Sequence, residues 1–246
     1  MFDPEIQIKR NSLELNEAAA ELFIRLAHDS INAYRNFSVA LSGGSTPRSL
    51  YALLASEKYR SSISWELVSF FFGDERAVPP DSDESNYRMA HETLLGPLRI
   101  SEEQIHRWQT ELSNINDAAA IYETDLCKYL ERSKRGLDLI LLGLGDDAHT
   151  ASLFPHSPAL HEKERLAVAN HIEKLNSDRL TMTFPLINSA ANIVFLVAGS
   201  SKAEAVAQVI EGQNRPDDYP AQMVKPEKGR VTWLLDEDAA ALLNQT

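Results

Sequence analysis

A histidine and two carboxylates follow a buried-strand pattern near the middle of the chain. The apolar run that begins at Leu137 ends at Gly143, and Asp146, Asp147 and His149 come within the next six residues. An imidazole titrates near neutral pH and suits proton transfer, and a neighbouring carboxylate can fix its tautomer. A lone histidine is more often structural than catalytic. Its place in a loop at the end of a strand nevertheless favours a proton-transfer role for His149.

A second loop combines two glycines with two hydroxyl side chains and could bind an anion. Its residues are Gly43, Gly44, Ser45 and Thr46. Thr46 precedes Pro47, which predicts a helix that starts here with Thr46 as its N-cap. Glycines leave backbone N–H groups free before a helix N-terminus, and such a site suits phosphate. The alternative is a plain tight turn, because the loop has neither the Walker lysine nor the dinucleotide-binding glycine spacing.

Charged residues stand at two further strand ends. Asp74, Glu75 and Arg76 directly follow an apolar run, and a guanidinium can grip phosphate or carboxylate with two hydrogen bonds. A structural Asp–Arg pair is the alternative there. Arg179 lies in a strand pattern, and Lys202 falls in the first turn of a predicted helix. The helix dipole disfavours a cation at that position, so Lys202 indicates an anion nearby, unless it is merely an exposed lysine.

The overall charge narrows the possible partners. Acidic residues outnumber basic ones 36 to 24, which gives a net charge of −12, and no basic cluster suits nucleic acid or a membrane surface. An anionic substrate therefore needs a local positive field. One cysteine, Cys127, permits no intrachain disulfide, and no signal-peptide or membrane-span pattern is present. We expect a soluble, cytoplasmic protein.

Short apolar runs alternate with helical patterns along the whole chain. Four runs are apolar almost throughout, which is typical of a parallel sheet covered on both faces: 37–41, 65–72, 137–143 and 192–199. Three more segments are predicted as strands: 5–10, 165–170 and 178–184. Helical periodicity is present in residues 16–35, 117–133 and 201–212. The stretch 230–245 is predicted to form a strand followed by a short helix. The polar segment 211–230 is interpreted as a surface loop.

These patterns predict one α/β domain over residues 1–246. We expect a doubly wound, mostly parallel, Rossmann-like sheet with helices on both faces. Four apolar strands run directly into candidate segments, after residues 41, 72, 142 and 198, and ligands bind outside the carboxyl ends of parallel strands. Several such loops at one edge of the sheet indicate a site there more strongly than any single loop does. The remaining histidines form no metal set, since His156 and His161 have no evident carboxylate partner.

Six motifs in order, between residues 39 and 241, resemble those of the 6-phosphogluconolactonases. They include "LSGGSTP", "FFGDERAVP" with "DESNY", "LGLGDDAHTASLFP", "DRLTMTFPL", "VAGSSKAEA" and "TWLLDEDAA". The resemblance implies an α/β fold shared with glucosamine-6-phosphate deaminases. It also implies hydrolysis of 6-phospho-D-glucono-1,5-lactone to 6-phosphogluconate in the oxidative pentose phosphate pathway, without a metal or organic cofactor.

The resemblance also assigns roles to residues of this chain. His149 matches the catalytic histidine, and Asp74 and Arg76 match the acid and base of Gly-Asp-Glu-Arg. Substrate-binding candidates are Gly43, Gly44, Ser45, Thr46, Asp147, Arg179 and Lys202. Two positions depart from the family pattern, because Ala148 and His156 stand where glycine is usual. If the first position needs a positive φ, alanine there destabilises the fold by about 1–2 kcal/mol.

Two other functions fit parts of the pattern. A deaminating isomerase needs an acidic partner in the histidine motif, and "HTASLFP" has no glutamate. A non-catalytic sugar-phosphate sensor could keep the phosphate loop without the histidine, and it usually carries a DNA-binding module. This chain has the histidine and no basic domain. The partner expected is the phosphosugar lactone, with the chain a monomer or weak homo-oligomer.

Overall fold

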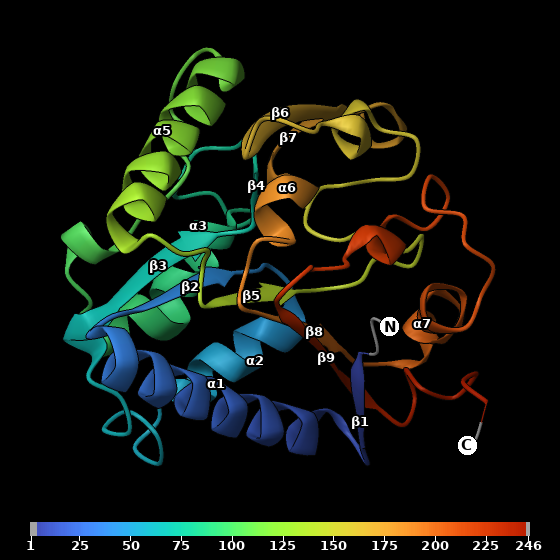
Figure 1. The fold of residues 1–246 in the computed structure, drawn as a ribbon, viewed down its shortest axis with the longest axis horizontal. Coiled ribbons are helices and arrows are strands. Elements are labelled where there is room, and N and C mark those ends of the chain that lie inside the picture. The colour runs from blue at the N-terminus through green and yellow to red at the C-terminus, as the bar shows by residue number, and fades with distance from the viewer. Residues whose placement is uncertain (1–3, 245–246) are drawn as a thin grey trace.

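A parallel sheet of six strands forms the central layer (Figure 1). The computed structural model describes residues 4–244. The strand order is β1-β9-β8-β5-β2-β3, and every neighbouring pair is parallel. The strands are β1 (Glu5–Lys9), β2 (Phe37–Leu41), β3 (Val68–Phe72), β5 (Leu139–Leu142), β8 (Asn192–Val197) and β9 (Arg230–Asp236). The predicted parallel sheet is therefore confirmed.

The inner strands are apolar because both of their faces are covered. Every residue of β2 and of β5 is buried, and on β8 and β9 the rings of Phe195 and Trp233 stack with centroids 3.8 Å apart. β3 is shorter than expected from the run 65–72, because Trp65–Leu67 forms a 3-10 turn before it. Buried inner strands of this kind give the loops at their ends a rigid support.

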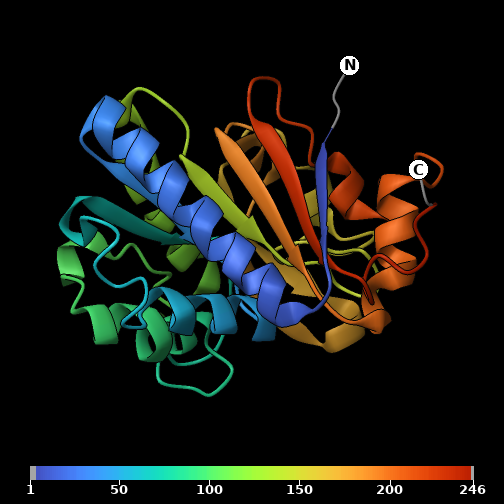
Figure 2. The same cartoon turned by 90° about the horizontal axis from the view of Figure 1, so that it is seen from below.

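Helices lie on both faces of the sheet (Figures 1 and 2). The helices are α1 (Ser12–Tyr34), α2 (Ser45–Leu54), α3 (Asn86–Ala90), α4 (Gly96–Leu98), α5 (Ile115–Ser133), α6 (Phe184–Ile187) and α7 (Ala203–Ile210). α1 and α2 pack together on one face, and α5 lies on the other side. α1 starts earlier than predicted because Asn11 caps it, accepting a hydrogen bond from the Glu14 N–H at 3.0 Å. The predicted C-terminal helix is wrong: residues 237–243 form turns.

A small antiparallel sheet stands above the main sheet. Its order is β4 (Asp74–Arg76), β7 (Ser177–Met182) and β6 (Ala167–Ile172). Gly73 joins the two sheets: its N–H donates to the Leu41 carbonyl at 2.8 Å and its carbonyl accepts from the Met182 N–H at 2.8 Å. The segments 165–170 and 178–184 are therefore strands as predicted, but they belong to this second sheet.

The segment 211–230 is more than a surface loop. Its middle forms a 3-10 turn, Pro220–Met223, in which Pro220, Ala221 and Gln222 are buried. This segment also supplies carboxylates that the sequence did not reveal. Nε2 of His156 lies 3.2 Å from an Asp218 oxygen, and Nε2 of His161 lies 3.7 Å from an Asp217 oxygen. Both histidines thus have acidic partners after all.

No helix between residues 4 and 244 is long and apolar enough to span a membrane.

Candidate active site

The loops singled out in the sequence all leave the carboxyl ends of strands of the main sheet. Residues 43–46 follow β2, residues 73–76 follow β3, residues 143–149 follow β5, and residues 199–202 follow β8. Because these strands are parallel, their loops lie along one edge of the sheet. Contacts between the loops show that this edge is a connected site.

His149 and Asp147 form a hydrogen-bonded pair in the loop after β5. Nδ1 of His149 lies 2.6 Å from Oδ1 of Asp147, and the imidazole stacks on the Phe154 ring with centroids 3.9 Å apart. Gly145 makes room for the imidazole, because a Cβ there would lie 2.0 Å from Nδ1 of His149. Within the described part of the chain, Nε2 of His149 has no hydrogen-bond partner. That nitrogen is therefore free to exchange a proton with a ligand.

Asp147 is held in its ionised form. Burial alone would raise the pKa of this carboxyl, but the hydrogen bond and positive charge of His149 outweigh it and bring the pKa well below its usual value. Nζ of Lys174, 3.5 Å from Oδ2, adds to this effect. When the imidazole is neutral, the ionised carboxylate accepts a hydrogen bond from Nδ1–H, and this favours the tautomer in which Nε2 is unprotonated.

Ala148 adopts a left-handed backbone conformation, with φ of 59° and no exposed surface. The positive φ considered from the sequence is therefore present, and this backbone conformation carries about 1–2 kcal/mol of strain that a glycine would not have. The carbonyl of Ala148 accepts a hydrogen bond from the Ala221 N–H at 3.1 Å, which holds the loop in place. His156, the second departure, also has a positive φ of 60°. Both departures thus fall where glycine would be unstrained.

The glycine loop after β2 leads directly into α2. Gly44, with φ of 108°, is the N-cap and the helix begins at Ser45, so the prediction of Thr46 as N-cap is wrong. The physical reason is that a β-branched residue does not adopt the backbone conformation that this junction requires. Ser45 is exposed at the helix start and Thr46 is half-buried behind it. The N–H groups of this first turn face the open end of the helix, as an anion requires.

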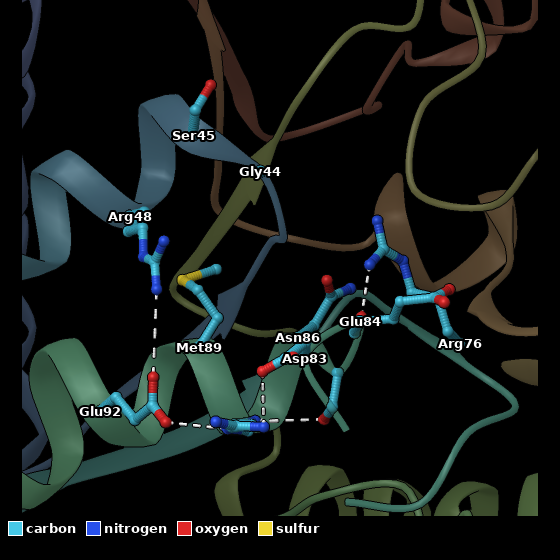
Figure 3. A pocket seen from close by; sticks show the side chains of 11 residues that line it. Gly44, Ser45, Arg48, Arg76, Asp83, Glu84, Asn86, Met89 and Glu92 are labelled. Atoms are coloured by element: carbon cyan, nitrogen blue, oxygen red, sulfur yellow. Dashed lines mark hydrogen bonds and ion pairs between the residues drawn. The ribbon is translucent and has the colours of Figure 1, made fainter. Parts of the chain in front are cut away.

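A pocket of about 290 Å³ opens beside this loop (Figure 3). Gly44, Ser45 and Arg76 line it, together with three residues that sequence reasoning missed: Arg48, Asn86 and Arg88. Arg88 is neutralised by Asp83 and Glu92 at 2.7 and 2.8 Å. The two extra arginines come from the interiors of helices, where no strand-end signal marked them. His149, Arg179 and Lys202 do not line this pocket.

Asp74 is buried and connects two parts of the site. Its Oδ2 accepts a hydrogen bond from the Ser152 hydroxyl at 2.7 Å, and its Oδ1 accepts one from the Asn86 side chain at 3.2 Å. Asn86 in turn lies against the glycine loop, because a Cβ on Gly43 would be 2.0 Å from its Oδ1. The structural Asp–Arg pair considered from the sequence does not form between Asp74 and Arg76. Asp74 instead connects the glycine loop of residues 43–46, through Asn86, to the segment after His149.

Glu75 accepts hydrogen bonds at the start of α3. Its carboxylate accepts hydrogen bonds from the N–H groups of Asn86 and Tyr87, each at 2.8 Å, and from the Ser85 hydroxyl at 3.1 Å. Burial raises the pKa of this carboxyl above its usual value. Of the three consecutive charged residues, the middle one is therefore structural.

Arg76 and Arg179 face each other across β4 and β7. Burial, and then the charge of Arg76, lower the pKa of the Arg179 guanidinium. Arg76 donates to the Glu84 carbonyl, and Arg179 to the Ser177 hydroxyl and the Asp178 carbonyl. Among the residues that the structure describes, no carboxylate forms an ion pair with either guanidinium. Two such cations side by side favour an anionic ligand.

Lys202 stands at the junction between a 3-10 turn and α7, and its ammonium forms an ion pair with Asp146. The loops after β5 and β8 are thus in contact. The residue that precedes this 3-10 turn is also held in place, because the Asp236 carboxylate accepts a hydrogen bond from the Gly199 N–H at 2.9 Å. The structure thereby brings all the predicted site residues to one edge of the sheet.

Comparison with known proteins identifies the family. The model described as "Glucosamine-6-phosphate isomerases/6-phosphogluconolactonase" matches residues 10–233. The chain belongs to this family.

Relatives and solved structures of this family match nearly the whole chain. The 6-phosphogluconolactonase of Synechocystis is 40% identical over 239 residues, covering 96% of this chain and 97% of its own. That of Nostoc is 37% identical over 242 residues, covering 97% and 98%. The solved 6-phosphogluconolactonase of Trypanosoma brucei has a TM-score of 0.88 at 29% identity and covers 99% of this chain and 100% of its own. The family fold expected from the motifs is confirmed.

Proposed function

We propose that this chain hydrolyses 6-phospho-D-glucono-1,5-lactone to 6-phosphogluconate, a step of the oxidative pentose phosphate pathway. The observation that carries the proposal is the His149–Asp147 pair, with its 2.6 Å hydrogen bond, at the same sheet edge as unpaired arginines. The family membership and the 6-phosphogluconolactonase names of the relatives support the same reaction. We further propose a cytoplasmic location and a monomer or weak homo-oligomer.

The imidazole acts first as a base and then as an acid. Nε2 of His149 takes a proton from water as the water oxygen bonds to the lactone carbonyl carbon. The bond from that carbon to the ring oxygen then breaks, and Nε2–H returns its proton to the ring oxygen. Asp147 stabilises the imidazolium between these steps. Atoms and charge balance without any cofactor.

The cations and N–H groups hold the substrate and its developing charge. Backbone N–H groups of the glycine loops, or Arg76, stabilise the oxyanion. The loop of residues 43–46 binds the phosphate together with a basic side chain at the same sheet edge, which is Arg76, Arg179 or Lys202. Binding energy from the phosphate, which does not react, thereby orients the lactone for attack. The hydrogen bonds of Asp74 hold the loop after β2 and the segment after His149 in fixed relative positions.

The test is replacement of the base. His149→Ala should lower lactone turnover by about 100-fold or more, because general-base assistance is lost, while binding of 6-phosphogluconate is retained. Turnover is measured with freshly generated lactone, after subtraction of spontaneous hydrolysis.

The chain offers a matched control for this variant. His106 also bonds an aspartate through Nδ1, to Asp125 at 2.9 Å, and stacks on an aromatic ring, that of Phe71. It lies beside the middle of β3, where its N–H donates to the Phe70 carbonyl at 2.8 Å, and its aspartate partner belongs to α5. His106→Ala should keep its turnover. Wild-type turnover in His149→Ala would eliminate this histidine as the base.

A further inference from the structure

The carboxyl end of β2 is held by a single buried hydroxyl. The Tyr51 hydroxyl donates to the Ser42 carbonyl at 2.9 Å and accepts from the Ser42 N–H, also at 2.9 Å. Tyr51 has no exposed surface, and burial raises the pKa of its phenol, so the hydroxyl keeps the proton that it donates. One hydroxyl thus forms hydrogen bonds with both the N–H and the carbonyl of Ser42.

This contact lies where the hydrogen bonds of the sheet end. β2 pairs with β3 as far as Leu41 and Phe72, and with β5 only at Val39 and Ala40. Ser42 is the next residue, and it is buried. Buried backbone groups without partners are strongly disfavoured. The Tyr51 hydroxyl supplies the partners that a neighbouring strand would otherwise provide.

The contact also links the two ends of the segment that contains the proposed phosphate loop. Ser42 precedes the two glycines, and Tyr51 lies two turns into α2, the helix that these glycines begin. The chain thus runs from the anchored residue through Gly43 and Gly44 into the helix and returns through the tyrosine. Glycines lose the most conformational freedom on ordering, so a Gly-Gly loop needs fixed ends.

The neighbouring strand shows the same arrangement with one difference. Tyr122 donates to the Phe72 carbonyl and accepts from the Phe72 N–H, both at 2.9 Å. There the carbonyl has a second donor, the Trp108 indole N–H at 3.0 Å. Within the described residues, the Ser42 backbone has only the tyrosine. The anchor at β2 is therefore the one most sensitive to loss of a hydroxyl.

We propose that Tyr51 is a positioning residue for the phosphate of the substrate: it fixes Ser42 and thereby the orientation of the Gly43–Gly44 loop and of the first-turn N–H groups of α2. This inference rests on the proposed function, since it takes the loop to bind phosphate. Tyr51 does not touch the ligand itself. Its effect is expected on binding of the phosphate group rather than on the proton transfers at His149.

The experiment compares Tyr51→Phe with Tyr129→Phe. Tyr129 is also buried, and its hydroxyl accepts from the Asn36 side chain at 3.2 Å, at the opposite end of β2. Tyr51→Phe should raise KM for the lactone, and the inhibition constant of inorganic phosphate, by about tenfold, the effect of roughly one lost hydrogen bond. kcat should fall by less than KM rises. Tyr129→Phe should leave both constants unchanged.

The outcomes separate this inference from the proposed function. A wild-type protein without lactonase activity would refute the function itself. A wild-type protein with normal activity, but equal KM and phosphate inhibition in the two variants, would refute only the role of Tyr51. A purely structural role would lower the folded fraction and leave KM unchanged.

A measurement on the wild type covers the case in which Tyr51→Phe does not fold. The Ser42 amide should exchange with solvent as slowly as amides in the centre of β2, because the Tyr51 hydroxyl protects it. Titration with inorganic phosphate should shift the amide signals of residues 44–46. Fast exchange at Ser42, or no shift in the loop, would contradict the proposal.

Discussion

At the scale of single residues, the backbone of the loop that carries His149 is strained. Ala148 has φ of 59° and Ala151 has φ of 48°, and both lie within two residues of the imidazole. Strained backbone is common where a side chain must be aimed at a ligand, and surrounding contacts must then maintain it. Here the hydrogen bond from Ala221 to the Ala148 carbonyl does so.

The strain predicts an unusual effect of a glycine substitution. Ala148→Gly relieves about 1–2 kcal/mol of left-handed strain. It also loses a buried methyl group and adds chain entropy, together about 1–2 kcal/mol. The free energy of unfolding should therefore change by less than about 1 kcal/mol, measured by urea denaturation.

A buried alanine with helical φ serves as the control. Ala119 has no exposed surface and lies inside α5. Ala119→Gly should destabilise by about 1–2 kcal/mol, from helix propensity and the lost methyl burial. Equal losses in the two variants would mean that Ala148 is unstrained.

Residue types at strand ends could be predicted from the sequence, but their partners could not. The sequence limited the acid beside His149 to Asp146 or Asp147, because both lie within three residues of it, and in the structure the partner is Asp147. Asn86 and Ser152, the partners of Asp74, are 12 and 78 residues away from it. Such pairs depend on how separate elements pack, which no local pattern encodes. The N-cap of α2 was wrong for a local reason, because Gly44 takes a backbone conformation that Thr46 disfavours.

At the scale of elements, the small antiparallel sheet positions the cations. β4 and β7 place Arg76 opposite Arg179, and like charges directly opposite each other destabilise a strand pair. The sequence did not predict this pairing because β4 has only three residues, too few for a periodic pattern. An anion bound beside this like-charge pair would reduce the repulsion.

The cation pair predicts that anions stabilise the fold. Inorganic phosphate should raise the Tm of the wild type by a few degrees, as binding to the native state alone requires. Arg179→Gln removes the repulsion, so its Tm without anion should equal or exceed that of the wild type. Its phosphate-dependent rise should be much smaller. Thermal unfolding with and without phosphate measures both effects.

The control for this prediction is an arginine that already has a carboxylate partner. Arg165 pairs with Glu123 at 2.9 Å. Arg165→Gln should not raise Tm without anion, and it should keep the full rise with phosphate. A rise in Arg179→Gln as large as in the wild type would show that the anion binds elsewhere.

At the scale of the whole molecule, the two sheets are joined by short and buried connections. One residue, Gly73, separates β3 from β4, and it hydrogen-bonds to both sheets. The Asp74–Ser152 bond adds a buried link across the site. These contacts support the prediction from the sequence that residues 1–246 form one domain.

A single domain predicts a single unfolding transition. Far-ultraviolet circular dichroism, which follows both sheets and the helices, should change together with tryptophan fluorescence as urea increases. The three tryptophans report on the main sheet and its flanking loops. Two separated transitions would instead show that the small sheet unfolds independently.

The order of strands in the main sheet also constrains how the chain folds during synthesis. Among the strands that the structure describes, β1 comes first in the chain, but its one neighbour in the sheet, β9, comes last. β8 likewise reaches β9 only at the end. The half of the sheet from β2, β3 and β5 can assemble on the growing chain, as N-terminal segments generally do. The edge formed by β1 and β9 cannot form until residues 230–236 have been synthesised, so β1 stays without a strand partner while all the intervening elements are made.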